Sequence, residues 1–308
     1  MARRKKGQPI NGWVILDKPL GLSSTQALGR VRWLFDAQKA GHGGTLDPLA
    51  TGILPLAFGE ATKTLPYILN AQKTYRFAVT FGQATNTDDA EGEVVETADY
   101  TPNVHEIKAI LPQFMGDIMQ TPPAYSALKI NGERAYSKAR KGEEVTLKPR
   151  PVTVFALEFL GQKGAVATFE ATVSKGTYIR SLGRDMAKAL GSCGHISLLR
   201  RVAIGAENGK MTEKHALSLE ELEKIVAFAG GRGHIPPEVL GAVDCLLDDI
   251  PAHIISPEQA QDLKQGKQIQ LAEALNGQIR ATNAEGQIVS LLEVTDGIAK
   301  VSRNFNIN

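Results

Sequence analysis

The sequence predicts an α+β fold, because strand and helix patterns mix without the regular alternation of a doubly wound sheet. Residues 75–81 and 167–173 alternate apolar with other side chains, as strands with one buried face do. The second strand is followed at 174–177 by a turn, and then by apolar residues at helical spacing from Tyr178 to Leu190. Gly191 is a natural end for that helix.

The first elements are expected to be a strand, a turn and a helix. Residues 13–16 are apolar, and 17–21 contain the Asp, Pro and Gly of a turn. Ser23 or Ser24 can cap the helix that follows, whose apolar side chains between 28 and 35 share one face. We expect a loop over 41–52, because its glycines and Asp-Pro step disfavour both a helix and a central strand.

The last part of the chain is expected to be a small, mostly β module. Glycine and proline interrupt any regular pattern between about 230 and 251. Beyond this boundary come a short helix at 257–264 and strands at 278–283, 287–292 and 297–301, with a hairpin turn at Glu285-Gly286.

Composition restricts the class of protein. The chain has 308 residues, of which 43% are hydrophobic and 22% charged, as in soluble globular proteins with a sizeable core. Cys193 and Cys245 make no metal-binding or redox spacing, so buried free thiols are expected and no metal site is predicted. No secretory signal or membrane-spanning apolar run is found. We therefore expect a cytoplasmic enzyme or binding protein.

The glycine-rich segment contains the most distinctive carboxylate. Glycine lets the backbone approach a ligand closely, and Pro48 restricts Asp47 to an extended backbone that fixes where its carboxylate points. An ordinary Asp-Pro turn explains an isolated pair of this kind equally well.

Residues 42–52, His-Gly-Gly-Thr-Leu-Asp-Pro-Leu-Ala-Thr-Gly, resemble the signature motif of the TruB family of tRNA pseudouridine(55) synthases. Further blocks match in the same order, at 11–12, 16–19, 73–75, 87–92, 125–129, 174–180 and 198–201. The resemblance implies the pseudouridine synthase fold, with a mixed, mainly antiparallel sheet and flanking helices. It also implies a catalytic domain over 1–245, a basic thumb-like insertion over about 123–151, and a PUA-like domain over 250–308.

The resemblance implies that Asp47 is the essential carboxylate and that no cofactor is needed. The carboxylate could attack C1′ or C6, or remove a ribose proton, and must be ionised first. Arg180, expected at a helix N-terminus, would lower the pKa of Asp47, because a guanidinium beside a carboxylate favours its charged form. Asp89 is the second expected partner of Arg180.

Four further positions are expected around the base. Tyr75 would stack on the uracil and assist the transfer of the C5 proton, and Leu199 would form an apolar wall. His42 matches the position that fills the gap left by the extracted base. Lys18 would either shape the turn after the first strand or contact a phosphate or the active-site network.

Local charge suggests where RNA binds. The segment 129–150 has seven basic residues against three acidic ones, an excess of four, although the whole chain is only +2. The residues expected to contact phosphate are Lys129, Arg134, Lys138, Arg140 and Lys141. The resemblance implies the TΨC stem-loop of tRNA as partner, with no membrane and no protein partner, and we expect a monomer.

Two other functions compete with the synthase. A tRNA-binding or chaperone protein without catalysis would have no use for Asp47, Tyr75, Asp89 and Arg180 together. A hydrolase with a carboxylate pair at Asp47 and Asp89 would release free uracil, whereas a synthase releases none.

Overall fold

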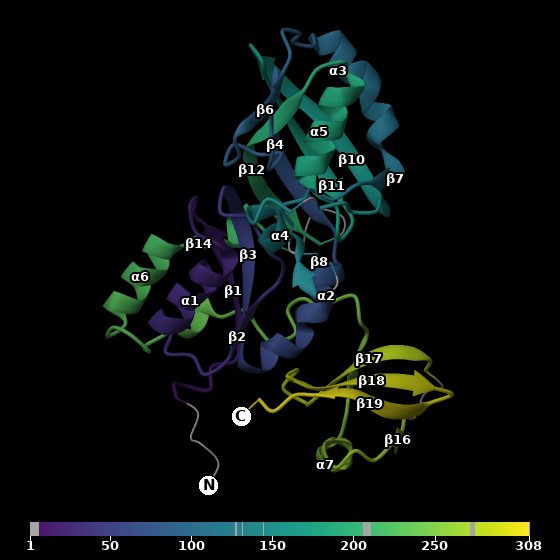
Figure 1. The fold of residues 1–308 in the computed structure, drawn as a ribbon. Coiled ribbons are helices and arrows are strands. Elements are labelled where there is room, and N and C mark those ends of the chain that lie inside the picture. Colours follow the sequence, from purple (N-terminus) through teal and green to yellow (C-terminus); the bar gives the residue numbers. More distant parts are fainter. Residues whose placement is uncertain are drawn as a thin grey trace.

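The structure is a computed structural model that describes residues 6–126, 128–130, 132–143, 145–205, 211–271 and 275–307. Within these residues, ten strands form one mixed sheet, which crosses the main body of the molecule (Figure 1). The main path runs β14 (Leu217–Ser218), β1 (Gly12–Lys18), β3 (Ala50–Phe58), β12 (Gly194–Ile204), β4 (Lys73–Phe81), β11 (Val166–Val173), β10 (Arg150–Lys163) and β7 (Gly116–Gln120). Two short strands, β2 (Ala40–His42) and β13 (Met211–Thr212), pair with β3 and β12.

Most strand pairs in this sheet are antiparallel, and the pairs β1–β14 and β3–β12 are parallel. The predicted mixed, mainly antiparallel sheet is therefore confirmed. The strands expected at 75–81 and 167–173 are β4 and β11, which pair side by side with Phe77 opposite Phe169. These two rings stack at 5.4 Å between centroids, in the core that the alternating pattern predicts.

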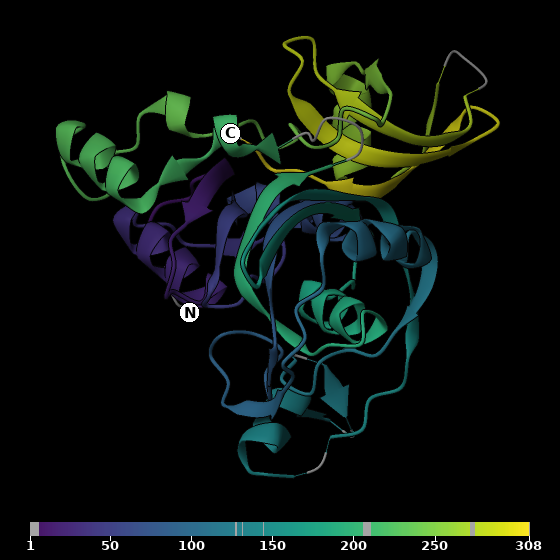
Figure 2. The same ribbon diagram turned by 90° about the horizontal axis from the view of Figure 1, so that it is seen from above.

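Helices cover the sheet in two groups (Figures 1 and 2). The described helices are α1 (Ser24–Leu34), α2 (Leu65–Asn70), α3 (Val104–Ile110), α4 (Ala135–Arg140), α5 (Ile179–Ala189), α6 (Leu219–Phe228) and α7 (Pro257–Lys264). Helices α1 and α6 pack on β1 and β3, where Val31 and Leu222 share a core with Leu54. Helices α3 and α5 pack on β4 and β11, where Ile107 and Leu182 share a second core with Phe77.

The loop expected over 41–52 is shorter than predicted. Its two ends belong to strands, since β2 ends at His42 and β3 begins at Ala50, between β1 and β12. Gly52 makes this possible in two ways. Its φ of +97° suits only glycine, and a side chain at this position would collide with the backbone of Arg201 in β12. Glycine at position 52 therefore allows a central strand here, although the glycines and the Asp-Pro step of 41–52 predicted a loop.

The thumb-like insertion begins and ends at paired strands. β7 and β10 are neighbours in the sheet, with Gln120 opposite Arg150, and the chain between them leaves the sheet and returns. It contains β8 (Lys129–Ile130), β9 (Glu133–Arg134) and α4. The segment is therefore attached at its two ends to one edge of the sheet.

The C-terminal segment forms the small, mostly β module that the sequence predicts, drawn in yellow in Figure 1. Its five strands run β15 (Ala252–Ile254), β17 (Gly277–Thr282), β18 (Ile288–Thr295), β19 (Ile298–Asn304) and β16 (Ile269–Gln270). Helix α7 coincides with the predicted helix. The module shares a core with the main body, in which Leu291 and Phe305 join Ile53 and Ile68.

The remaining described elements are short. They are a hairpin of β5 (Gln83–Thr85) and β6 (Val94–Thr97), and the 3-10 helices η1 (Gly59–Thr64), η2 (Leu111–Phe114), η3 (Glu213–His215) and η4 (Pro237–Val239). None of the helices in the described part of the chain is long and apolar enough to cross a membrane.

Candidate active site

The site is an open pocket of about 1240 Å³ where four separate segments meet. These segments are the loop before β3, the start of β4, the loop between β5 and β6, and the N-terminus of α5, with the thumb-like insertion on one side.

Asp47 lies in the loop between β2 and β3, and buried polar side chains hold this loop. The Ser24 hydroxyl, at the start of α1, accepts from the amide of Leu46 at 2.8 Å and donates to its carbonyl at 3.1 Å. Ser23 supplies the cap of α1 instead, in a capping box with Gln26. The loop is thus fixed directly before Asp47 by one serine, while its neighbour fixes the helix.

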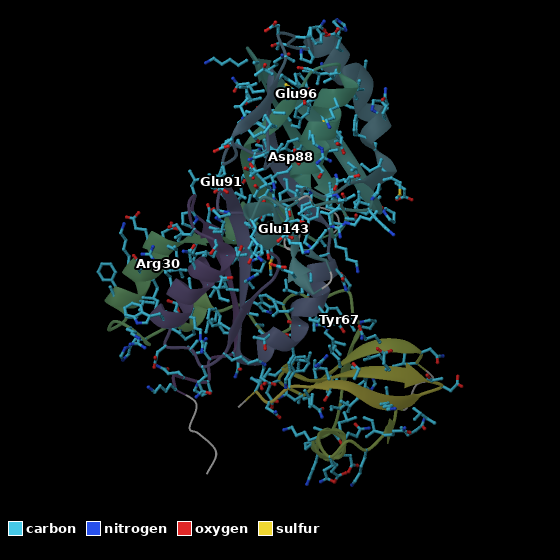
Figure 3. All side chains as sticks on the ribbon, in the orientation of Figure 1. Arg30, Tyr67, Asp88, Glu91, Glu96 and Glu143 are labelled. Atoms are coloured by element: carbon cyan, nitrogen blue, oxygen red, sulfur yellow. The ribbon has the colours of Figure 1, made fainter. Side chains whose placement is uncertain are left out.

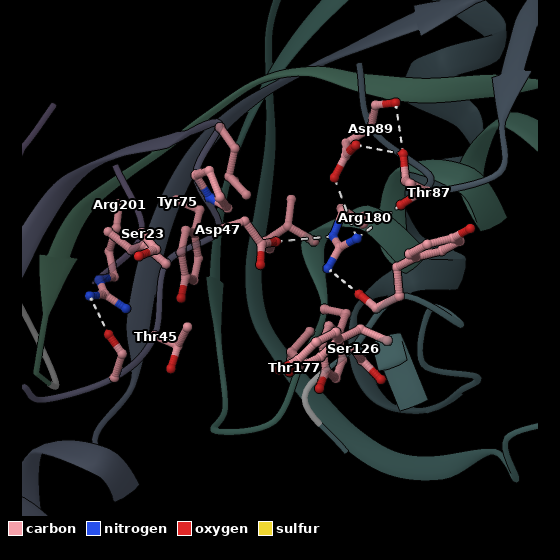
Figure 4. Close-up of a pocket in the computed structure, with 18 of the residues that line it drawn as sticks. Ser23, Thr45, Asp47, Tyr75, Thr87, Asp89, Ser126, Thr177, Arg180 and Arg201 are labelled. Carbon is pink, nitrogen blue, oxygen red and sulfur yellow. Dashed lines mark hydrogen bonds and ion pairs between the residues drawn. The ribbon is translucent and has the colours of Figure 1, made fainter. Parts of the chain in front are cut away.

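Arg180 lies in the first turn of α5, as predicted, and its guanidinium faces Asp47 and Asp89 (Figure 4). Its Nε is 3.1 Å from Oδ2 of Asp47, and its Nη1 is 3.4 Å from Oδ2 of Asp89. It also donates to the carbonyls of Thr87 and Tyr125, each at 2.9 Å. One side chain, 7% exposed, therefore joins three loops around the pocket.

The N-terminus of α5 has an unusual support that explains the placement of Arg180. No side chain caps the helix at Tyr178. The buried amide of Gln120, at the end of β7, instead accepts from the Tyr178 amide at 2.8 Å and donates to its carbonyl at 3.1 Å. The edge of the sheet thus fixes the position from which Arg180 reaches the pocket.

Electrostatics refine one expectation about Asp47. Burial raises the pKa of Asp47 above its ordinary value, while Arg180 and Lys18 act in the opposite direction. Arg180 thus lowers this pKa as the sequence predicts, but the net shift is upward. The reason is that removing water from the carboxylate outweighs the ion pair.

Lys18 is wholly buried, and its ammonium serves the loop. It donates to the carbonyls of Pro19 at 2.9 Å, Leu22 at 2.6 Å and Pro48 at 3.4 Å. Burial lowers the pKa of Lys18 to about 8, against the opposing effect of Asp47. These contacts are within the turn after β1 and with the carbonyl of Pro48, next to Asp47. A buried ammonium with these partners does not face a phosphate.

Strand register brings the remaining expected side chains together. In β12, Leu199 lies opposite Ala50 of β3 and Phe77 of β4, and Arg201 lies opposite Gly52 and Tyr75. Tyr75 and Leu199 both line the pocket, where the two cores of the main body meet. His42 lines the same pocket at the end of β2. Burial, with Arg201 nearby, lowers the pKa of His42, so its imidazole is neutral near neutral pH.

The five predicted phosphate contacts are only partly described. The side chains of Lys129, Arg134 and Arg140 lie outside the part of the chain that the structure describes. Lys141 is exposed and pairs with Glu133 at 2.6 Å, and Lys138 pairs with Glu143, labelled in Figure 3, at 3.6 Å. Both lysines are thus paired with glutamates of the same segment, which are two of the three acidic residues already counted in its net excess of four.

Several residues that shape the pocket were not predicted as site residues. Arg201 is 1% exposed and donates to the carbonyls of Ile53 at 2.7 Å and Gly44 at 3.1 Å, which ties β12 to β3 and to the Asp47 loop. Tyr178 lines the pocket and lies under the guanidinium of Arg150, at 5.1 Å. Both occur in blocks that match the family motif, but neither has a spacing that reveals its role. Within the described residues, no cluster of His, Cys, Asp or Glu is arranged to hold a metal ion.

Comparisons with known proteins agree with this geometry. Residues 32–179 match the family model described as TruB family pseudouridylate synthase, N-terminal domain. The tRNA pseudouridine synthase B of Dinoroseobacter shibae is 46% identical over 286 residues, which cover 92% of this chain and 88% of the relative. That of a Caulobacter species is 44% identical over the full length of both chains.

Solved structures share the fold. A chain in the crystal structure of a Cbf5-Nop10-Gar1 complex superposes with a TM-score of 0.72 at 25% identity, covering 96% of this chain and 85% of that chain. A chain of an H/ACA RNP bound to a substrate RNA also gives 0.72, at 21% identity, covering 100% of this chain and 92% of that chain. With relatives at this identity over nearly the whole sequence, the chain belongs to the TruB family of pseudouridylate synthases.

Proposed function

We propose that this protein converts uridine to pseudouridine at position 55, in the TΨC loop of tRNA, with Asp47 as the essential carboxylate. The observation that carries the proposal is the Asp47–Arg180 pair, whose Nε–Oδ2 distance is 3.1 Å, in an open pocket of a TruB-family chain. The relatives named tRNA pseudouridine synthase B support tRNA as the substrate.

The reaction is an isomerisation that needs no external reactant. The bond between N1 and C1′ breaks, the uracil turns, and a bond forms between C5 and C1′. The proton leaves C5 and N1 ends with a proton, so substrate and product have the same atoms. Asp47 acts either as a nucleophile toward C1′ or C6 or as a base toward the ribose, and each role requires its ionised form.

Ionisation of Asp47 depends on its neighbours. Burial opposes it, whereas Arg180 in direct contact and the nearby Lys18 favour it. The side chain of Asp47 is still 39% exposed toward the pocket, so an incoming ribose and base can reach it. We assign Arg180 to hold the carboxylate charged and oriented, and Asp89 to hold Arg180.

The other pocket side chains suit an extracted base. Tyr75 offers an aromatic face and a hydroxyl, and Leu199 offers an apolar surface on the neighbouring strand. We assign His42, at the end of β2, to occupy the gap left in the RNA stack, and its lowered pKa supports a neutral imidazole there. The RNA backbone is expected along the thumb-like insertion, over about 123–151.

We propose a catalytic domain over 1–245 and a PUA-like domain over 250–308, the second making minor contacts with the tRNA. The segment 251–308 carries five basic and six acidic residues, which does not suit a strong electrostatic grip. We also propose that the protein acts in the cytoplasm as a monomer without a protein partner. Sedimentation of the protein alone and with tRNA tests the monomer.

The decisive experiment maps pseudouridine in unmodified tRNA after incubation with the purified protein. Pseudouridine at the TΨC-loop uridine, with no free uracil, is the expected result. Pseudouridine at another position would assign the chain a different substrate site. Release of uracil would favour the hydrolase, and tRNA binding without any product would favour a binding protein.

A further inference from the structure

Buried polar atoms without partners gather at the pocket. Within the described residues, three buried side-chain atoms have no hydrogen-bond partner, namely His42 Nδ1, Ser126 Oγ and Arg150 Nε. His42 and Ser126 line the pocket, and Arg150 lies over the ring of Tyr178, which also lines it. Folded proteins avoid unpaired buried polar groups, because such groups have lost their hydrogen bonds to water without gaining others. The two that belong to pocket-lining residues, His42 Nδ1 and Ser126 Oγ, indicate partners that arrive with the ligand.

Ser126 is the most informative of the three. It is only 4% exposed, and its main chain is already engaged, since its amide donates to the Ala124 carbonyl at 3.1 Å and its carbonyl accepts from Tyr136 at 3.0 Å. Of the polar groups of Ser126, the side-chain hydroxyl is therefore the one available to a ligand in the pocket.

The position of Ser126 is fixed relative to the catalytic carboxylate. The carbonyl of Tyr125, one residue earlier, accepts from Nη2 of Arg180 at 2.9 Å. The same planar guanidinium contacts Asp47 through Nε, and Figure 4 shows Ser126 below Arg180 in the pocket. A single rigid group thus links the serine to the site of bond breaking.

The chemistry of the hydroxyl selects the part of the substrate that it meets. Serine hydroxyls can contact phosphates, but a charged phosphate stays near solvent, whereas Ser126 is buried. An extracted uracil is neutral and offers two carbonyl oxygens and one N–H along its imide edge. Enzymes that extract a base hydrogen-bond this edge inside their pocket.

We propose that Ser126 Oγ hydrogen-bonds the imide edge of the extracted uracil and so helps the pocket to select this base. The inference rests on the proposed function and adds to it a specificity-determining residue within the thumb-like insertion. The hydroxyl can donate to a carbonyl oxygen or accept from the N–H, and each contact is absent when the base is absent.

The first test compares Ser126→Ala with Ser192→Ala. Ser192 is also a buried serine, but its hydroxyl donates to the Tyr100 carbonyl at 2.6 Å, away from the pocket. We expect Ser126→Ala to lower kcat/KM about ten-fold, as the loss of one good hydrogen bond does, with Tm unchanged or raised. Ser192→Ala should lower Tm and leave kcat/KM near the wild-type value. A Ser126→Ala enzyme with lower Tm and wild-type activity at permissive temperature would make the serine structural.

The second test asks whether the contact is to the base. In an Asp47→Asn background, which blocks turnover, binding is measured to a TΨC stem-loop RNA with uridine or with an abasic nucleotide at the target position. Adding Ser126→Ala should weaken binding of the uridine RNA and leave the abasic RNA unchanged. Equal weakening for both RNAs, or none for either, overturns the inference. If wild-type protein makes no pseudouridine, the proposed function fails; if it does and Ser126→Ala matches it, only this inference fails.

Discussion

The two loops that supply partners to Arg180 hold their aspartates in opposite ways. Asp89, between β5 and β6, has a side chain 9% exposed and accepts from the Thr87 hydroxyl at 2.6 Å, the Glu91 amide at 3.0 Å and Arg180. Asp47 is 39% exposed on its side chain, and Arg180 is its one ion-pair partner in the described part of the chain.

We therefore expect the two aspartates of this ion-pair network to have different roles, Asp89 in stability and Asp47 in chemistry. A carboxylate with several donors is stabilised as an anion and is a poor nucleophile or base. A carboxylate with one partner and a raised pKa keeps free lone pairs for a substrate. The comparison predicts that activity depends chiefly on Asp47, and that stability depends chiefly on Asp89.

The largest effect is expected for Asp47→Asn. The amide cannot act as nucleophile or base, so the rate of pseudouridine formation should fall by about 10³-fold or more. Because the pKa of Asp47 is raised on folding, its charged form destabilises the fold at neutral pH, and the variant should show an unchanged or higher Tm. Single-turnover assays and thermal unfolding measure the two values. A clear fall in the Tm of this variant would contradict the expectation that Asp47 serves activity and not stability.

Arg180→Met should have the next largest effect, which depends on pH. The ionised Asp47 is the active form, so activity falls as pH drops through its pKa. Without Arg180 that pKa rises further, and the acidic limb of the rate profile moves to higher pH. At neutral pH we expect a loss of about 10²-fold. Arg180→Lys keeps the charge and should shift the limb less. Profiles measured from about pH 5 to about pH 9 that superpose for all three proteins would exclude this role.

Asp89→Asn should affect stability more than activity, the reverse of what we expect for Asp47→Asn. Its amide group would face the donors of Thr87 and Glu91, at a cost of about 1–3 kcal/mol in the free energy of unfolding. Tm should fall by several degrees, while activity under stabilising conditions should fall only about ten-fold, through a less well fixed Arg180. Denaturant unfolding together with single-turnover rates tests this. A rate loss as large as that of Asp47→Asn would make the two aspartates equivalent.

The smallest effect is expected for Lys141→Ala. Lys141 and Lys267 are equally exposed at 59%, and each pairs with one acidic residue, but only Lys141 belongs to the thumb-like insertion. Lys141→Ala should weaken tRNA binding about two- to three-fold and reduce the salt dependence by about one unit of slope. Lys267→Ala, in the C-terminal module, is the matched control and should change neither. Equal effects of the two substitutions would show that the C-terminal module makes part of the RNA contact.

Much of the fold followed from local patterns. The alternation in β4 and β11 and the helical spacing of α5 each predict a buried face, and burial decides these elements. The start of β3 was missed, because Gly52 is required by the close approach of Arg201, a contact between distant segments. Local composition carries no information about such a neighbour.

The site was predicted through motif resemblance, and its supporting contacts were not. Asp47, Tyr75, Arg180 and Leu199 all line one pocket, as expected. Ser24 and Gln120 act through backbone atoms of other segments, so their types alone do not reveal their partners. The net direction of the pKa shift of Asp47 also lies beyond the sequence, because burial is a property of the assembled fold.

The absence of a side chain at Gly43 links the catalytic loop to the end of the chain. A side chain there would collide with Ile68 of α2, so that helix sets how far the loop can settle. Helix α2 continues from η1, where Lys63 donates to the Asn304 carbonyl at 2.8 Å and Glu60 accepts from the Asn306 amide at 2.7 Å. The residues at and just after the end of β19 thus support the 3-10 helix and helix against which the loop that carries Asp47 packs.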